Sequence, residues 1–258
     1  MNLFLPCHYA AFQDPKPTLD DSLTRTERVQ VRDALLELDE MLWPFIKASG
    51  WDLHRHRRSA NYVSSHHFVY LPDGTPIVRQ IGGMWLHYGK SPGQLDFFKR
   101  MGGSDYRNRD LEENYDAFYH HTRIQFFLGA SVFRCWLLLA TDKSAYDREE
   151  FLDRRLKDQA GKAAFYNLVH PLVGKGFFYE LIDVSGERTT LQLDSELTQE
   201  DLISFVKRGR QGFYSGIVKE YQPDDPALDR GRIREEMVRN LEWLYPVYEF
   251  MAWRSLSR

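Results

Sequence analysis

A histidine pair followed by an arginine is the first candidate for chemistry in this sequence. The segment His120-His121-Thr122-Arg123 leads into an apolar run, and residues two apart on a strand point to the same side. His121 and Arg123 would therefore share a face, where the guanidinium binds phosphate oxygens and the imidazole moves a proton. This pattern predicts a small phosphoester hydrolase with His121 and Arg123 as its catalytic residues. The alternative without chemistry is a strand end with solvent-facing imidazoles.

A basic stretch with interleaved aromatic residues, between positions 51 and 90, is the second candidate. Arginine and lysine side chains contact phosphates, and a tryptophan or tyrosine stacks on a base. The stretch predicts recognition of nucleic acid or of a nucleotide-like anionic ligand, and a solvated sheet face is the alternative. The residues that we expect to bind the ligand are Arg55, Arg57, Arg58, Arg79, Trp85 and Lys90.

A third cationic group, Lys207, Arg208 and Arg210, lies at the end of a helix that we expect to begin after Thr198. Cations at a helix C-terminus complement the helix dipole, so the group needs no ligand to explain it. We include it in the ligand-binding surface on the hypothesis that folding brings it beside Arg55 and the histidine pair.

No metal or cofactor is expected. His54 and His56 share a strand face, but a metal site would need a third ligand that only the fold could place. The two cysteines, Cys7 and Cys135, lie far apart and form no Cys-x-x-C pair. The sequence also lacks a Walker-type loop, a G-x-S-x-G elbow, an H-E-x-x-H motif and a dinucleotide-binding glycine motif. These observations favour a non-catalytic recognition or adaptor protein, with the hydrolase as the alternative.

A hydrophobic hairpin near the middle of the chain is expected to position the first candidate. Arg123–Leu128 and Val132–Ala140 are rich in aromatic and β-branched residues, and Gly129-Ala130-Ser131 separates them. This arrangement predicts two antiparallel strands joined by a short turn. Since the second run is apolar at most positions, we expect a central strand that is covered on both faces.

The remaining strands and helices complete an α+β pattern. Short turns between neighbouring strands predict mainly antiparallel sheet built from hairpins, with Gly82-Gly83 as a bulge or a hairpin turn. Helices are expected to flank the sheet. The last of them, from about Arg230 to Arg254, is long and contains Pro246, which should kink it.

The N-terminal region is expected to hold an arm and a helix. Residues 1–22 contain the sequence Asp-Pro-Lys-Pro, which resists helix formation, and predict an extended arm. The segment 24–27 fits a capping box for the following helix, and Gly50 fits its end.

Composition limits the classes of function. The 258 residues fit one α+β domain, and the polar segment 103–116 is a candidate subdomain boundary. Aromatic residues make up 14 %, which indicates a bulky core or surfaces for stacking. The formal net charge is −3, so nucleic-acid binding would depend on a local basic patch.

Localisation and partners follow from the same composition. No run approaches the roughly 18 apolar residues of a membrane span, and the first residues do not resemble a signal peptide. We therefore expect a soluble, cytoplasmic protein without a membrane partner. The long C-terminal helix suggests a third function, that of an interaction subunit that docks on a protein partner within a larger complex.

Overall fold

A computed structural model of the chain describes residues 1–13, 22–55, 63–70, 76–91, 93–94, 121–140, 145–183, 187–209 and 214–253. For residues 22–27, 63–70 and 76–82 it describes the backbone alone. The predictions for Arg57, Arg58, Arg210 and the segment 103–116 lie outside the described residues, as does the side chain of Arg79.

One antiparallel sheet contains all eight strands of the described residues, and helices flank it, which confirms the predicted α+β class. The order across the sheet is β1-β3-β4-β5-β8-β6-β7, and β2 pairs with β3 beside this path. The strands are β1 (His54–Arg55), β2 (Val63–Tyr70), β3 (Pro76–Gly89), β4 (Arg123–Gly129), β5 (Phe133–Leu138), β6 (Phe177–Ile182), β7 (Arg188–Gln192) and β8 (Tyr214–Tyr221).

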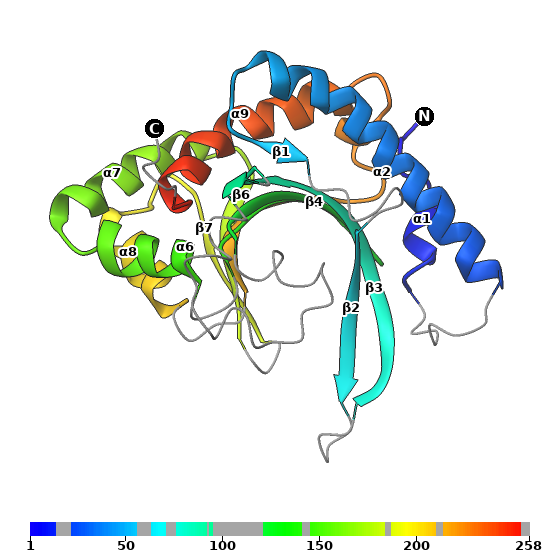
Figure 1. Cartoon of the computed structure of the whole chain (residues 1–258), viewed down its shortest axis with the longest axis horizontal. Helices are drawn as coiled ribbons and strands as arrows, with labels where there is room; N and C mark the ends of the chain where they lie inside the picture. Colours follow the sequence, from blue (N-terminus) through cyan, green and yellow to red (C-terminus); the bar gives the residue numbers. More distant parts are fainter. Residues whose placement is uncertain are drawn as a thin grey trace.

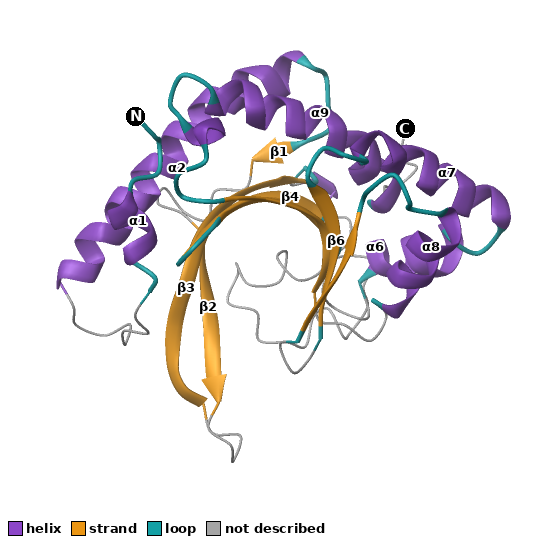
Figure 2. Cartoon of the chain, turned by 180° about the vertical axis from the view of Figure 1, so that it is seen from behind, coloured by secondary structure: helices purple, strands orange, loops and turns teal. Residues whose placement is uncertain are grey.

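The sheet is strongly curved, and the helices lie along its outer side (Figure 1). Helix α2 contacts β3, and α9 contacts β4 and β5, so these two long helices cover the outer face. The reverse view in Figure 2 shows α7 and α8 beyond the β6 side of the sheet. The helices are α1 (Pro6–Ala10), α2 (Ser22–Ala48), α6 (Tyr146–Glu149), α7 (Gln159–Val169), α8 (Gln199–Arg208) and α9 (Ile233–Met251), with a π-helical turn (Glu150–Arg155) and two 3₁₀ turns (His170–Leu172 and Pro226–Leu228).

The predicted central hairpin is present as β4 and β5. The amide of Gly129 donates to the carbonyl of Val132 at 3.0 Å and closes the turn. β5 lies between β4 and β8, and Phe133, Cys135 and Leu137 on one of its faces belong to the main hydrophobic core. Trp136 and Leu138 on the other face belong to a second, smaller cluster with Phe178 and Val218. The strand is therefore buried on both faces, as its apolar sequence predicts.

The outer face of the sheet carries the main core, because alternate residues of each strand point toward α2 and α9. Two tyrosines fix this packing. Tyr88 on β3 donates from its hydroxyl to Asp39 on α2 at 2.8 Å, and Tyr221 on β8 donates to Glu236 on α9 at 2.7 Å. A buried phenol needs such an acceptor, so these contacts also set the position of each helix over the sheet.

The strand β3 differs from the sequence prediction. Two strands were expected there, whereas one continuous strand crosses Gly82-Gly83, so the hairpin-turn alternative is wrong and the bulge is correct. Ser65 of β2 is opposite Gly83 while His66 is opposite Ile81, which leaves Gly82 as the extra residue. Gly83 also has a packing role, because a Cβ atom there would meet the ring of Phe127.

Other predicted elements are confirmed, with two corrections at the N-terminal end. The segment 24–27 is not a helix start, since α2 is already helical at Ser22, although Gly50 follows the helix with a φ of 66° as expected. The arm is not extended over residues 1–13: α1 forms there, and Leu3 and Phe4 are buried in the core. Burial of these two apolar side chains is favourable, whereas an extended arm would leave them exposed to water.

Candidate functional site

The inner face of the curved sheet, opposite α2 and α9, carries most of the polar residues of the strands. Residues paired across antiparallel strands point to the same side, so the register defines three rows on this face. The first row is Arg123, Leu138, Gly216, Glu180 and Thr190; the second is His87, Gln125, Trp136, Val218, Phe178 and Gln192; the third is Trp85, Phe127, Arg134 and Glu220. We call these 15 positions the inner face.

Arg123 links the first two rows. It is 2 % exposed, and its Nε donates to Gln125 Oε1 at 3.2 Å. Its Nη1 donates to the carbonyl of His121, also at 3.2 Å. The guanidinium is thus held in one orientation on the inner face. Arg123 therefore contacts His121 through the backbone carbonyl of the histidine. The His121 side chain is buried.

Two tryptophans lie on either side of this polar group. Trp85 is in the third row, with its ring centroid 6.3 Å from that of Phe127. Trp136 is in the second row, directly opposite Gln125, and its ring lies 5.8 Å from that of Tyr214. The face thus combines aromatic surfaces with hydrogen-bonding groups from neighbouring strands, a combination typical of binding sites for planar polar ligands.

A cluster of four charged residues lies at the other side of the inner face, with three members among its 15 positions and Arg188 just beyond them, opposite Ile182. We call it the Glu180 cluster: Arg134, Glu180, Arg188 and Glu220. Glu220 Oε1 lies 2.7 Å from Arg134 Nη2 and 2.7 Å from Arg188 Nη2. Glu180 pairs with Arg188 Nε and lies 3.6 Å from Arg134 Nη1. Two cations and two carboxylates balance, so the cluster as a whole carries no formal charge.

Burial and ion pairing act on the pKa of Glu180 in opposite directions. Its side chain is fully buried, and this burial raises the pKa of the carboxyl against the attraction of Arg134 and Arg188, which lowers it. A buried carboxylate is costly unless it is paired. Exposure increases toward β7, where Arg188 and Gln192 are exposed, so the β7 side is the solvent-facing end of the inner face.

Lys90, which the sequence assigned to ligand binding, lies in a separate buried cluster at the ends of β3 and β4. Its side chain is 1 % exposed, its Nζ lies 3.0 Å from Asp147 Oδ1, and it also donates to the carbonyl of Trp253. The same carboxylate accepts hydrogen bonds from the amides of Thr122 at 2.7 Å and Trp253 at 2.8 Å. These contacts give Lys90 a structural role.

We call this group, together with Arg148, the Asp147 cluster. Arg148 donates through Nη1 to the carbonyl of Ala140 at 2.8 Å and through Nη2 to the carbonyl of Gly209. The cluster connects the ends of β3, β4, β5, α8 and α9.

Arg55 lies on the opposite face of the sheet from Arg123. It is paired in register with Tyr88, whose side chain points to the outer face. Its Nη1 lies 3.2 Å from Asp39 Oδ2 and 3.3 Å from Glu40 Oε1, and its guanidinium stacks 4.5 Å from the ring centroid of Trp43. The contacts attach β1 to α2 and account for the charge without a ligand.

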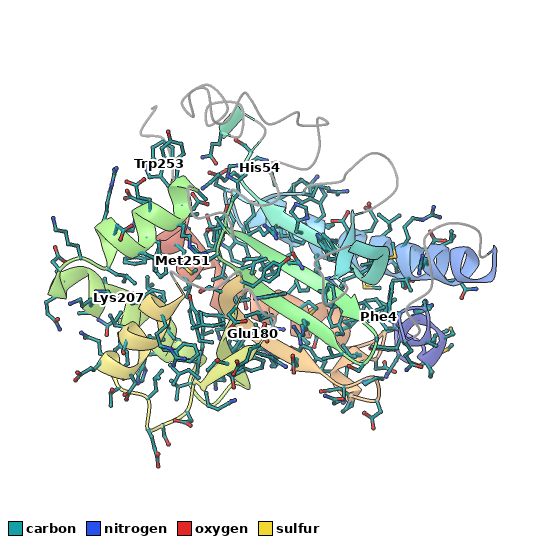
Figure 3. The ribbon with its side chains drawn as sticks, turned by 90° about the horizontal axis from the view of Figure 1, so that it is seen from below. Phe4, His54, Glu180, Lys207, Met251 and Trp253 are labelled. Atoms are coloured by element: carbon teal, nitrogen blue, oxygen red, sulfur yellow. The ribbon has the colours of Figure 1, made fainter. Side chains whose placement is uncertain are left out.

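Lys207 and Arg208 lie at the end of α8, away from both Arg55 and Arg123. Arg208 packs over the ring of Phe205 in its own helix, at 5.3 Å. Figure 3 shows Glu180 near the middle of the sheet, with Lys207 and His54, the neighbour of Arg55, on different sides of it. The described members of the three predicted cationic groups therefore do not converge on one surface.

Metal binding and protein docking find no specific support in the described residues. His54 Nε2 lies 2.9 Å from Asp52 Oδ1, but no group of three or more potential metal ligands occurs among the described residues. Most of the apolar residues of α9 are buried, and Met1 is the only large hydrophobic residue with high exposure among those described. Burial of α9 therefore leaves little exposed apolar surface on this helix to support docking on a protein partner.

The sequence analysis missed the Glu180 cluster, although a signal was present. Arg134 and Glu180 each interrupt a run of apolar residues in a buried strand. A charged residue at such a position normally has a partner of opposite charge, so each of these two residues predicts an oppositely charged neighbour. Only the register of β5, β8 and β6 shows which charges pair.

The fold and the inner face define an α+β protein built on one curved antiparallel sheet, with a polar and aromatic inner face. No protein-family model matches the sequence, and no curated protein is significantly similar to it. Within the described part of the chain, no helix has the length and apolar character needed to cross a membrane.

Proposed function

We propose that this protein recognises a small, nucleotide-like anionic ligand on the inner face of its sheet. The observation that carries the proposal is the register that places Trp85 of β3 and Trp136 of β5 on the same face as Arg123 and Gln125, which are two apart on β4. A guanidinium and an amide suit phosphate oxygens, and an indole suits the face of a base.

A small ligand is favoured over a long nucleic acid. Binding along a nucleic-acid backbone needs several cations on one surface. Arg55 is committed to α2 on the outer face, Lys90 to Asp147, and Arg208 to the end of α8. On the inner face, Arg123 lies beside the amide of Gln125 and close to the aromatic residues, whereas Arg134 and Arg188 are balanced by Glu180 and Glu220, an arrangement that matches one phosphate better than a chain of them.

Titration calorimetry with nucleoside monophosphates, and with inorganic phosphate for comparison, tests this proposal. We expect Arg123→Lys to weaken nucleotide binding by at least about tenfold, because lysine lacks the planar fork of donors. The matched control is Arg55→Lys on the outer face, which should leave binding unchanged. Equal losses in the two variants, or no binding by the original protein, would refute the proposal.

Binding to an oligonucleotide is the outcome that would favour the broader recognition hypothesis. In that case the affinity should fall steeply with salt, and replacing Arg55, Arg57 and Arg58 together by alanine should reduce it. No loss in that triple variant would exclude the basic stretch as a nucleic-acid surface.

Hydrolysis of a phosphoester is a second candidate, favoured by the 3.2 Å contact between Arg123 Nη1 and the His121 carbonyl. That contact holds the backbone of His121 beside the guanidinium that is proposed to bind the phosphate. The His121 imidazole would then serve as general acid or base. Turnover of p-nitrophenyl phosphate should then be abolished by His121→Ala while the far-UV circular dichroism is unchanged. Persisting turnover would remove His121 from the mechanism.

A further inference from the structure

The first row of the inner face joins a cation to a carboxylate. Arg123 and Glu180 lie three strands apart, with Leu138 and Gly216 at the two positions between them. Neighbouring strands are about 4.8 Å apart, so the two backbone positions are separated by roughly 14 Å. The sheet curves around this face (Figures 1 and 2), and a backbone separation of this size is comparable with the length of a nucleotide.

The Trp136 indole lies within this span. A Cβ atom on Gly216 would be 2.9 Å from Trp136 Nε1, so the ring nitrogen lies over the glycine that is opposite Glu180. Trp136 is 6 % exposed, and its Nε1 has no hydrogen-bond partner among the residues that the structure describes. A buried indole N–H nearly always donates to an acceptor, which makes it a candidate donor to a bound ligand.

Glu180 supplies an acceptor on β6, opposite Gly216 of β8. A carboxylate accepts about four hydrogen bonds, so the ion pairs with Arg134 and Arg188 leave it capacity for another donor. The Nε1 donor of Trp136 thus lies over Gly216, and the Glu180 acceptor occupies the position opposite that glycine. Adenine presents the complementary pair, a ring nitrogen that accepts and an exocyclic amino group that donates.

We infer, building on the proposed function, that the inner face selects nucleotides whose base carries an exocyclic amino group. Arg123 binds the phosphate, Trp136 Nε1 donates to a ring nitrogen of the base, and Glu180 accepts from the amino group. A base with a carbonyl oxygen in place of the amine brings a second acceptor toward Glu180, which repels it. Specificity therefore comes from the carboxylate and not from the phosphate contact.

Calorimetry with adenosine monophosphate and inosine monophosphate tests the inference for donation from Trp136 to N7, because the two ligands share the phosphate and the N7 acceptor. They differ at the exocyclic group and at the neighbouring N1, which is an acceptor in adenine and carries a hydrogen in hypoxanthine. The original protein should bind adenosine monophosphate about tenfold more tightly, the effect of one charge-assisted hydrogen bond. Glu180→Gln should reduce this ratio to about threefold or less. Trp136→Phe should weaken the binding of both ligands and leave their ratio unchanged.

The outcomes separate this inference from the function on which it rests. Equal binding of the two nucleotides by the original protein, with the expected loss in Arg123→Lys, would overturn the base selection and keep the phosphate site. An unchanged ratio in Glu180→Gln would also overturn it. Failure of both nucleotides to bind would refute the proposed function as well. Urea unfolding of each variant shows whether it is folded, and Trp136→Phe supplies a second readout if Glu180→Gln is not.

Discussion

The Asp147 cluster and the Glu180 cluster are two ways of burying charge in one protein. Asp147 is bonded to backbone amides and to one ammonium, and its partners come from chain segments that are far apart in the sequence. Glu180 is bonded to arginines of β5 and β7, which flank its own part of the sheet, and those arginines also share Glu220. In the second cluster a neighbouring carboxylate, Glu220, binds the same two arginines as Glu180 does.

This difference indicates different roles. Charge that binds backbone groups of several segments holds a fold together, and its loss leaves an unpaired buried ion. Ion pairs that are shared among several side chains can change partners within the network. A binding surface requires such adjustable contacts. The three predictions below test this comparison, from the largest expected effect to the smallest.

Loss of the Asp147 charge should be the most damaging change. We expect Asp147→Asn to lower the free energy of unfolding by about 3–5 kcal/mol, because the buried ammonium of Lys90 and the amides of Thr122 and Trp253 lose the carboxylate that they bind. The double variant with Lys90→Met should recover part of this loss, since it removes the buried ammonium that Asp147 binds. Urea denaturation measures both, and a loss below about 1 kcal/mol for Asp147→Asn would contradict the role assigned to the cluster.

Removal of the Glu180 charge should cost less and should change the pH dependence. Glu220 still pairs with both arginines, so we expect Glu180→Gln to lower the free energy of unfolding by about 1–2 kcal/mol at pH 5. Burial raises the pKa of Glu180 in the folded chain, so the folded state binds this proton more tightly than the unfolded state does. Its stabilising contribution is present below the ordinary carboxyl pKa and is lost as pH rises through the folded pKa.

The Gln variant has no such titration, so its deficit relative to the original protein should shrink as pH rises from about 5 to 8. Denaturation curves at several pH values measure this trend. A deficit that grows with pH would show that attraction to the arginines, and not burial, dominates at Glu180.

The smallest effect is expected at the exposed end of the Glu180 cluster. The Arg188 side chain is 37 % exposed, and ion pairs of this kind contribute about 0.2–1 kcal/mol. Arg188→Ala should therefore lower the free energy of unfolding by no more than about 1 kcal/mol, including the lost packing over Phe178. A loss comparable with that of Asp147→Asn would remove the distinction between the clusters.

The sequence was informative about elements whose signal is local. The apolar runs and glycine-containing turn gave β4 and β5, and Thr198 gave the start of α8, where its side chain accepts from the amide of Asp201 at 3.1 Å. Such features depend on residues within a few positions of each other. The structure at Gly82-Gly83 was harder to predict, because a bulge and a hairpin turn have the same local composition. They differ in whether a separate strand pairs with the residues on both sides of the glycines.

The sequence was less informative about the candidate site. Arg55, Lys90 and Arg123 look alike as cations near strand ends, but they lie on the outer face, in the Asp147 cluster and on the inner face. The chain alone does not reveal these surroundings, because each partner is distant in sequence: Asp39 for Arg55 and Asp147 for Lys90.

The sequence by itself determined the α+β class, the hydrophobic central hairpin and the start of α8, because strand alternation, turn residues and caps act over a few residues. Tertiary structure decided which charges are structural and which lie on the inner face. Strand order and register set that outcome, since they place Gly216 opposite Glu180, with Trp136 Nε1 over that glycine, and send Arg55 to the opposite side.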